Sequence, residues 1–267
     1  MEFFVVDAFT HRPFSGNPAA VCVLDQPIDD RCMQAIAREV NLSETAFVEP
    51  KPDGLFNLRW FTPAKEVDLC GHATLASAHI LWQEGHLQPD STASFATQSG
   101  SLHCRRGEKN RIVMDFPMEI ATPCIPSEDL VKGIGSDGDR YLVNRLHYMV
   151  VLRDASTLRA LKPDFTRLAH LDRRGVIVTS PSDDGRFDFL SRYFVPKLGI
   201  NEDPVTGSAH CSLGPYWAER LHKTEMTGYQ ASSRGGIVGV RVRPDDGRVD
   251  LIGDAITVMR TQLLVGA

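Results

Sequence analysis

The chain has 267 residues, with 29 basic and 34 acidic residues, a formal net charge of −5 and 42% hydrophobic composition. These values are those of an ordinary globular protein, and they exclude a disordered, collagen-like or disulfide-scaffold chain. The longest apolar runs are far below the roughly 20 residues that cross a bilayer, and the first residues turn polar too early for a secretory signal. We therefore expect a cytoplasmic protein with no membrane partner.

The cysteines and the charge pattern exclude two further classes. Six cysteines are scattered without a C-x-x-C pair, so reduced thiols are expected rather than disulfides. The densest basic run is Arg105-Arg106, with Lys109 and Arg111 nearby. Because a phosphate backbone requires a clustered basic face, nucleic acid is not an expected partner.

Short strands and two helices are expected in the first half of the chain. Turn-bounded, β-rich stretches predict strands over residues 2–9, 20–24, 42–48, 55–61, 94–98, 101–104 and 111–116. A helix capped by Asp29 or Asp30 is expected to reach about Val40. The next helix, over residues 71–82, is apolar or small on nearly every face, so we expect it to be buried all round.

The second half continues in the same way. Strands are expected over residues 141–152, 176–179, 187–194, 238–242, 249–252 and 255–264. A short helix is expected over residues 164–170 and an apolar helix over residues 207–221. No linker or low-complexity tract separates the two halves.

One internal repeat organises these elements. The pentads R-W-F-T-P at residues 59–63 and R-Y-F-V-P at residues 192–196 lie 133 positions apart, half the chain. Each leads through a polar loop to a glycine, Gly71 or Gly207, that opens an apolar helix. This predicts duplication of one α/β unit. We place the halves at residues 1–124, closed by a C-terminal strand over about residues 255–267, and at residues 125–267.

The two helix starts indicate a place for chemistry. A helix N-terminus presents unpaired backbone N–H groups and about half a positive charge, which suits a carboxylate or an enolate. Gly71 and Gly207 allow the backbone to approach a ligand closely. If pseudo-symmetry brings the two starts together, they form a cradle for an anion.

Glu44 is the candidate acid/base. Period-2 alternation puts Leu42, Glu44 and Ala46 on one strand face, where apolar neighbours would desolvate the carboxylate and suit it to moving protons at neutral pH. The alternative is an edge-strand charge that faces water.

Other polar residues lie beside the two glycines. His72, in the first turn of its helix, can hydrogen-bond a substrate or orient a carboxylate. Asp203 and Ser208 flank the other helix start, where Asp203 and Thr206 compete as the N-cap. Turn and cap chemistry is the alternative explanation for these residues.

Other classes of site lack their motifs. Cys70, His72, His210 and Cys211 offer soft ligands, but the C-x₂₋₄-C or H-x₃₋₅-H spacing of structural zinc sites is absent, so no metal is expected. His79 and His210 are expected to be satisfied core histidines. The absence of G-x-G-x-x-G, Walker and G-x-S-x-G sequences argues against dinucleotide, P-loop and nucleophile-elbow sites.

Five motifs span the chain. They are PFSGNPA at residues 13–19, NLSETAF at 41–47, RWFTP at 59–63, CGHATLA at 70–76 and EDPVTGSAHC at 202–211. Together, and in this order, they resemble the PhzF family of phenazine-biosynthesis-like isomerases.

The resemblance implies a diaminopimelate-epimerase-like α+β fold, with two pseudo-symmetric halves that each wrap a sheet around a central helix and an active site between them. Carried over by motif, Glu44 shuttles a proton during an isomerisation, with His72, Asp203 and Ser208 around it. The same motifs supply the expected substrate-binding residues Asn17, Ser43, Gly71, Ala73, Thr206 and Gly207.

The expected activity is a cofactor-independent isomerisation of a small anionic carboxylate. Glu44 would take a proton from carbon beside a conjugated acid and return it elsewhere, while helix N–H groups stabilise the enolate. The resemblance also implies a homodimer. Two alternatives stay open: an amino-acid epimerase or racemase that uses Cys70, with or without Cys211, and a metabolite-binding protein that keeps the scaffold without the chemistry.

Overall fold

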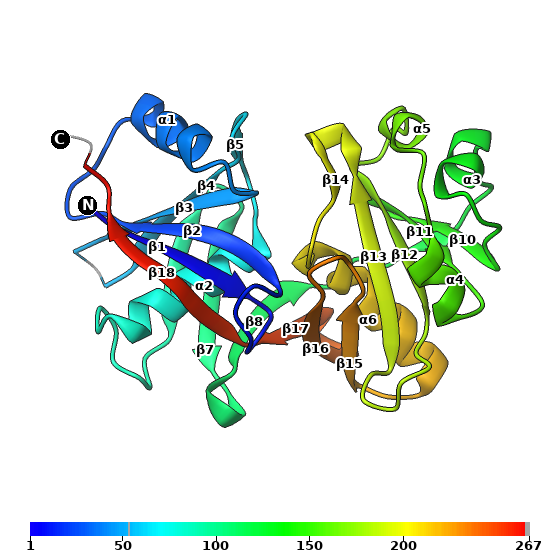
Figure 1. Ribbon diagram of the computed structural model, residues 1–267. Coiled ribbons are helices and arrows are strands. Elements are labelled where there is room, and N and C mark those ends of the chain that lie inside the picture. The colour runs from blue at the N-terminus through cyan, green and yellow to red at the C-terminus, as the bar shows by residue number, and fades with distance from the viewer. Residues whose placement is uncertain (53, 265–267) are drawn as a thin grey trace. The chain divides into compact units, whose positions relative to one another are not determined.

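A computed structural model of the chain describes residues 1–52 and 54–264. These residues form two units (Figure 1): unit 1 is Met1–Asp115 with the chain from Ile252 onward, and unit 2 is Phe116–Leu251. The boundary at residue 115 precedes the one placed at residue 124, because residues 122 and 123 pair with a strand of unit 2. Residues 265–267 of the expected C-terminal strand lie outside the described residues.

Unit 1 consists of nine strands and two α-helices among the described residues. They are β1 (Glu2–Ala8), β2 (Asn17–Val23), α1 (Asp30–Val40), β3 (Glu44–Pro50), β4 (Phe56–Phe61), β5 (Glu66–Val67), α2 (Gly71–Gln83), β6 (Ala93–Thr97), β7 (Gly100–Arg106), β8 (Ile112–Pro117) and β18 (Ala255–Gln262).

The strands of unit 1 form a mixed sheet. β1 pairs antiparallel with both β18 and β2, β2 runs parallel to β3, and β3 pairs antiparallel with β4. β4 pairs antiparallel with the short β5 and parallel with β6, which continues through β7 to β8. The two parallel pairs are joined by α1 and α2, as crossover connections require.

The two helices of unit 1 contact opposite faces of its strands. Met33, Ile36 and Ala37 of α1 pack with Ala20 and Phe47 in one cluster, while α2 contacts β1, β2, β3 and β18. Along α2 only Gly71, His79 and Gln83 are not buried, which confirms a helix buried on all sides. Because β2 is covered on both faces, it is apolar at nearly every position.

Unit 2 contains four α-helices and nine strands among the described residues. They are β9 (Thr122–Pro123), α3 (Glu128–Ile134), β10 (Arg140–Val143), β11 (His147–Val151), α4 (Ala155–Ala160), α5 (Phe165–Ala169), β12 (Gly175–Pro181), β13 (Phe189–Val195), β14 (Ile200–Glu202), α6 (Gly207–Leu221), β15 (Glu225–Gln230), β16 (Gly236–Arg243) and β17 (Arg248–Gly253).

The pairing in unit 2 repeats that of unit 1. β10 pairs antiparallel with β11, β11 runs parallel to β12, and β12 pairs antiparallel with β13. β13 then pairs antiparallel with the short β14 and parallel with β15, which pairs with β16. In chain order, α4 and α5 take the place of α1, and α6 takes the place of α2. The predicted duplication is therefore present in the topology.

The repeated pentad has the same structural role in each unit. The Arg59 guanidinium binds both oxygens of Glu66 at 2.7 and 2.8 Å and lies 5.2 Å from the Phe61 ring. Arg192 binds Glu202 at 2.8 and 2.8 Å and lies 4.9 Å from the Phe194 ring. In both units the arginine ties a long strand to the short strand that precedes the buried helix, which explains why the pentad recurs.

Some elements differ from the sequence expectation. Residues 141–152 form two strands rather than one, because the Asn144 side chain accepts hydrogen bonds from the Leu146 and His147 N–H groups and turns the chain. Helix α3 was not expected, although Ser127 caps its start and Gly135 ends it with φ of 73°. Strand β15 was also missed.

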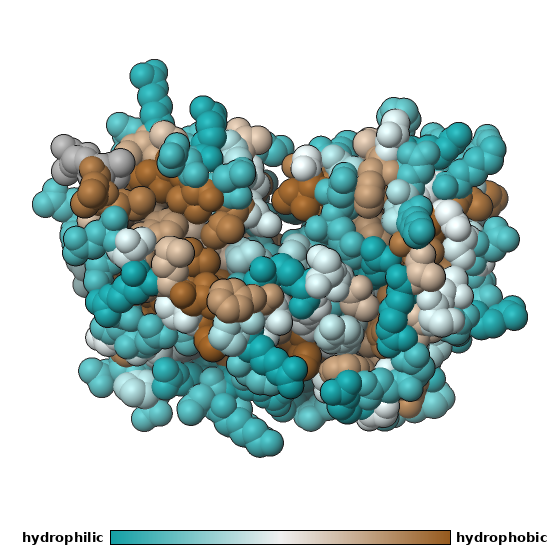
Figure 2. Space-filling view, viewed as in Figure 1, coloured by the Kyte–Doolittle hydropathy of each residue, from teal (hydrophilic) through white to brown (hydrophobic). Residues whose placement is uncertain are grey.

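The surface of unit 1 is partly apolar. Figure 2 shows hydrophobic residues at the surface beside α1 and β18. The partly buried Val5, Leu42 and Leu263 pack against the cluster that contains Met33, Ile36 and Ala37 of α1. Among the described residues, no helix has both the length and the apolar character needed to cross a bilayer.

Candidate active site

Glu44 begins β3 and is largely withdrawn from water. β3 pairs with β2 on one side and β4 on the other, so Glu44 does not lie on an edge strand. Its side chain is 12% exposed. Residues 45–48 are all buried, so the desolvation comes from cover on both faces rather than from the strict alternation assumed from the sequence.

His72 lies in the first turn of α2 and contacts the carboxylate. Its Nε2 is 3.3 Å from Glu44 Oε2. Burial lowers the pKa of His72 from 6.5 to about 3, so the ring is neutral at physiological pH. The Asn17 side-chain nitrogen lies 3.1 Å from Nδ1. With Nδ1 accepting from Asn17, the ring proton is on Nε2, the nitrogen that lies 3.3 Å from Glu44 Oε2.

Cys70 adds a thiol to this group. It is buried, and its Sγ lies 3.4 Å from His72 Nδ1 and 3.9 Å from Nε2. The ligand atoms of Glu44, Cys70 and His72 all lie within 4.8 Å of one another. The linear spacing examined in the sequence does not reveal this cluster, because Glu44 lies 26 positions before Cys70.

The start of α2 carries the other candidates of unit 1. Cys70 is the N-cap residue, and it makes no side-chain capping bond. Gly71 is half-buried at the first helical position, whereas Ala73 is fully buried among the core residues. Ser43 is half-buried just before β3. The α2 helix therefore begins without a capping bond from the Cys70 side chain.

The start of α6 shows a different polar arrangement. Thr206 is the N-cap residue, but its side chain does not cap the helix. Its hydroxyl instead donates to Asp203 Oδ2 at 2.5 Å. Gly207 is buried and Ser208 is half-buried in the first turn. The competition between Asp203 and Thr206 is thus resolved as a bond between them.

Gln230 is a residue of this group that sequence reasoning missed. It is fully buried at the end of β15. Its Oε1 accepts from the Thr206 N–H at 2.9 Å, and its Nε2 donates to the Asp203 carbonyl at 2.7 Å. A buried amide with both ends bonded fixes the loop that carries Asp203 and Thr206. No local pattern in the sequence marks a glutamine that acts from 24 residues away.

The predicted site residues therefore form two groups. Asn17, Ser43, Glu44, Gly71, His72 and Ala73 belong to unit 1, and Asp203, Thr206, Gly207 and Ser208 belong to unit 2. Within unit 1 the structure brings Asn17, Glu44 and His72 into contact.

The two remaining helix histidines are structural in different ways. His79 is partly buried, and its Nε2 lies 3.1 Å from Thr257 Oγ1. His210 is fully buried, and its Nδ1 donates to the Thr206 carbonyl at 2.8 Å. Its Nε2 has no hydrogen-bond partner in the described chain, so the expected satisfied histidine is satisfied on one side only.

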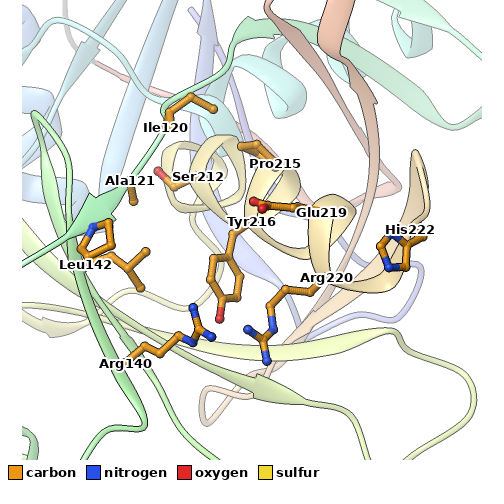
Figure 3. Close-up of a pocket in the computed structure, with 11 residues that line it drawn as sticks. Ile120, Ala121, Arg140, Leu142, Ser212, Pro215, Tyr216, Glu219, Arg220 and His222 are labelled. Carbon is orange, nitrogen blue, oxygen red and sulfur yellow. The ribbon is translucent and has the colours of Figure 1, made fainter.

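Unit 2 also contains a pocket of about 550 Å³ that is lined by other residues. It lies along α6 and β10 (Figure 3), where the Arg140 and Arg220 guanidinium groups flank the Tyr216 hydroxyl. The Arg220 guanidinium lies 5.6 Å from the Tyr216 ring. No residue proposed for catalysis or substrate binding lines this pocket.

Comparison with known proteins gives concordant matches. Residues 6–261 match the family model described as phenazine biosynthesis-like protein, PhzC-PhzF. A curated relative from Halalkalibacterium halodurans, named as an uncharacterized isomerase, is 51% identical over 265 residues that cover 98% of each chain.

Solved structures agree with the fold. A PhzF-family phenazine biosynthesis protein from Enterococcus faecalis matches with a TM-score of 0.93 at 40% identity and covers 99% of each chain. A probable proline racemase from Agrobacterium radiobacter has a TM-score of 0.66 at 10% identity, covering 99% of this chain and 93% of that one, which shows the fold alone. These matches confirm the epimerase-like α+β fold expected from the sequence.

Proposed function

Because the chain belongs to the phenazine biosynthesis-like PhzC-PhzF family, we propose that it is an isomerase that moves a proton on a small unsaturated or cyclic carboxylate. Glu44 carries the proton in this proposal. The observation that supports it most directly is the buried contact between Glu44 and a neutral His72.

The Glu44 carboxylate is placed to act as a base. Its low exposure strips away most of the water that would otherwise stabilise the charge. The neutral His72 ring lies 3.3 Å from one carboxylate oxygen and adds no competing positive charge. Asn17 keeps the ring in the tautomer with its proton on Nε2.

The proposed reaction needs no electron acceptor. Glu44 takes a proton from a carbon beside the conjugated acid, and the electron pair of the broken C–H bond passes into the conjugated system. Glu44, whose carboxyl proton exchanges with solvent, then gives a proton to a different carbon, where a new C–H bond forms. Electrons and atoms balance within the substrate, so the step requires no cofactor.

Backbone and side-chain donors are proposed to bind the substrate anion. The uncapped first-turn N–H groups at Gly71 and Ala73 suit negative charge that develops during the reaction. Ser43 and Asn17 are the proposed contacts beside them. From unit 2 we propose Asp203 and Ser208 as catalytic contacts, with Thr206 and Gly207 as binding residues.

Deuterium exchange tests this function. The protein is incubated in deuterated water with a panel of small unsaturated and cyclic carboxylates, and deuterium uptake at carbon is followed by mass spectrometry. Glu44→Gln should lower exchange by about 10²-fold or more, because it removes the group that carries the proton.

Glu49→Gln is the matched control, since Glu49 lies on the same strand β3. It should exchange at the rate of the unchanged protein. Exchange by a folded Glu44→Gln variant at that same rate would refute the proposal, as would an unchanged protein that exchanges no member of the panel.

A thiol-dependent epimerase is the second candidate, and the position of Cys70 beside His72 favours considering it. A reaction with two opposed thiols also needs a second reactive cysteine. Cys211 is buried, and burial raises its pKa to about 12, which disfavours its thiolate. Full activity in a Cys70→Ser variant would exclude this candidate.

A further inference from the structure

Glu44, Cys70 and His72 form a cluster of three side chains that can each bind a metal ion. Proton transfer by one carboxylate does not require the thiol. We propose that this cluster binds a divalent cation of the zinc class and that the bound cation inhibits the enzyme. The inhibition rests on the proposed function, whereas the binding of the cation does not.

The distances in the cluster are close to those of a tetrahedral zinc site. Zinc lies about 2.0–2.3 Å from its protein ligands, which places tetrahedral ligand atoms about 3.3–3.6 Å apart. His72 Nε2 is 3.3 Å from Glu44 Oε2 and 3.9 Å from Cys70 Sγ. All three ligand atoms lie within 4.8 Å of one another. The distance between Nε2 and Oε2 is therefore already within the tetrahedral range, and Cys70 Sγ must move closer to Nε2 to enclose a cation.

The donor set selects the kind of cation. A thiol, an imidazole and one carboxylate favour zinc, cobalt or copper over magnesium and calcium, which prefer several oxygen ligands. Three protein ligands leave a fourth position for water. A thiolate and a carboxylate together also balance the two charges of the cation, which keeps a buried site close to neutral.

The surroundings assist each ligand. Cys70 is the N-cap residue of α2, so its thiol lies at the start of that helix beside His72. Coordination through Nε2 places the ring proton on Nδ1, where Asn17 lies at 3.1 Å and can accept it through its amide oxygen after rotation.

Occupancy by a cation would stop proton transfer. Binding releases the thiol proton of Cys70 to solvent and places a carboxylate oxygen of Glu44 against the metal. The lone pair that accepts the substrate proton then belongs to a metal–oxygen bond.

Cobalt titration tests the site without any assay of activity. Co²⁺ bound to a thiolate gives a charge-transfer absorption band in the near ultraviolet. We expect the absorbance to saturate at one Co²⁺ per chain. The band should be absent from Cys70→Ser and should disappear when Zn²⁺ is added to displace Co²⁺. Cys32→Ser is the matched control, because Cys32 is a half-buried thiol of α1 outside the cluster, and it should keep the band.

Two further variants test the remaining ligands while the thiol stays in place. Glu44→Gln should weaken Co²⁺ binding at least tenfold, and Asn17→Ala should weaken it about 10–100-fold through the His72 ring. Circular dichroism verifies that each variant is folded. Absence of the band from the unchanged protein, or an unaltered band in folded Cys70→Ser, would overturn the site.

Zinc is then added to the deuterium-exchange assay. Saturating Zn²⁺ should abolish exchange, and a chelator should restore it. A cobalt band with exchange undiminished by Zn²⁺ would overturn the inhibition. If the protein catalyses no exchange, the proposed isomerase fails, and the cobalt titration still decides whether the cation site exists.

Discussion

The buried histidines should make the stability of the protein sensitive to acid, and this is the largest effect on the free energy of unfolding that we expect. His72, His147 and His210 are buried, and burial lowers their pKa values from 6.5 to about 3, 3 and 4. Below pH 6.5 the unfolded chain binds a proton at each position, whereas the folded protein does not until the pH approaches these lower values. Their contribution to stability is therefore complete above pH 6.5 and is lost as the pH falls toward 4.

The expected slope is steep. One such histidine changes the free energy of unfolding by about 1.4 kcal/mol per pH unit, so three change it by about 4 kcal/mol per pH unit. At pH 5 the accumulated loss is about 6 kcal/mol. A typical domain is stable by about 5–15 kcal/mol, so this loss removes much of its stability. We therefore expect cooperative acid unfolding at about pH 5 or below.

Denaturant titrations between about pH 5 and pH 7.5 measure this slope directly. His147→Gln removes one of the three groups and should lower the slope by about one third. His86→Gln is the matched control, because His86 is exposed, and it should keep the original slope. A slope of about 1.4 kcal/mol per pH unit or less, or no change in His147→Gln, would refute the reasoning.

Three substitutions test the packing described above through thermal or denaturant unfolding. Gly16→Ala should lower the free energy of unfolding by about 2 kcal/mol or more, because Gly16 has φ of +67° and an added Cβ would lie 2.2 Å from a backbone oxygen. Unchanged stability would contradict that geometry. Arg192→Met should lower the free energy of unfolding by about 3 kcal/mol, because it leaves the Glu202 carboxylate, which is only 19% exposed, without its arginine partner. A second change, Glu202→Leu, should restore the stability, and failure to do so would contradict the pairing. Gln230→Leu should cost about 2 kcal/mol or more by leaving a buried N–H at the start of α6 unpaired, and unaltered stability would show that this amide does not hold the loop.

Local sequence patterns were sufficient to predict helices that are buried on all sides or that begin at a residue whose side chain caps them. Helix α2 is apolar on every side, and α1 starts where Asp29 accepts from the Cys32 N–H, so their bounds followed from the sequence. The repeat was visible because the same arginine–glutamate pair is needed in each unit. Strand β15 was missed because it contains the buried Gly228 and Gln230, and its pairing with β13 and β16 cannot be read from a local stretch of sequence.

The candidate site was predictable in its residue types but not in its partners. Glu44 and His72 could be nominated from their motifs, whereas their contact depends on the pairing of β3 beside β2 and on the packing of α2 against both. Gln230 had no motif at all, because its role is defined by distant backbone groups. The sequence analysis considered only Cys70, His72, His210 and Cys211 as metal ligands and did not place Glu44 among them, since Glu44 comes from a separate strand.

The arginine–glutamate pair common to both units separates support from chemistry. Each unit contains the pair, whereas the residues beside its helix-opening glycine differ: cysteine and histidine in unit 1, threonine and serine in unit 2. The side chains that hold the short strand in place are therefore not those that lie beside the helix start. Substitutions beside either glycine can alter the chemistry there while both arginine–glutamate pairs stay in place.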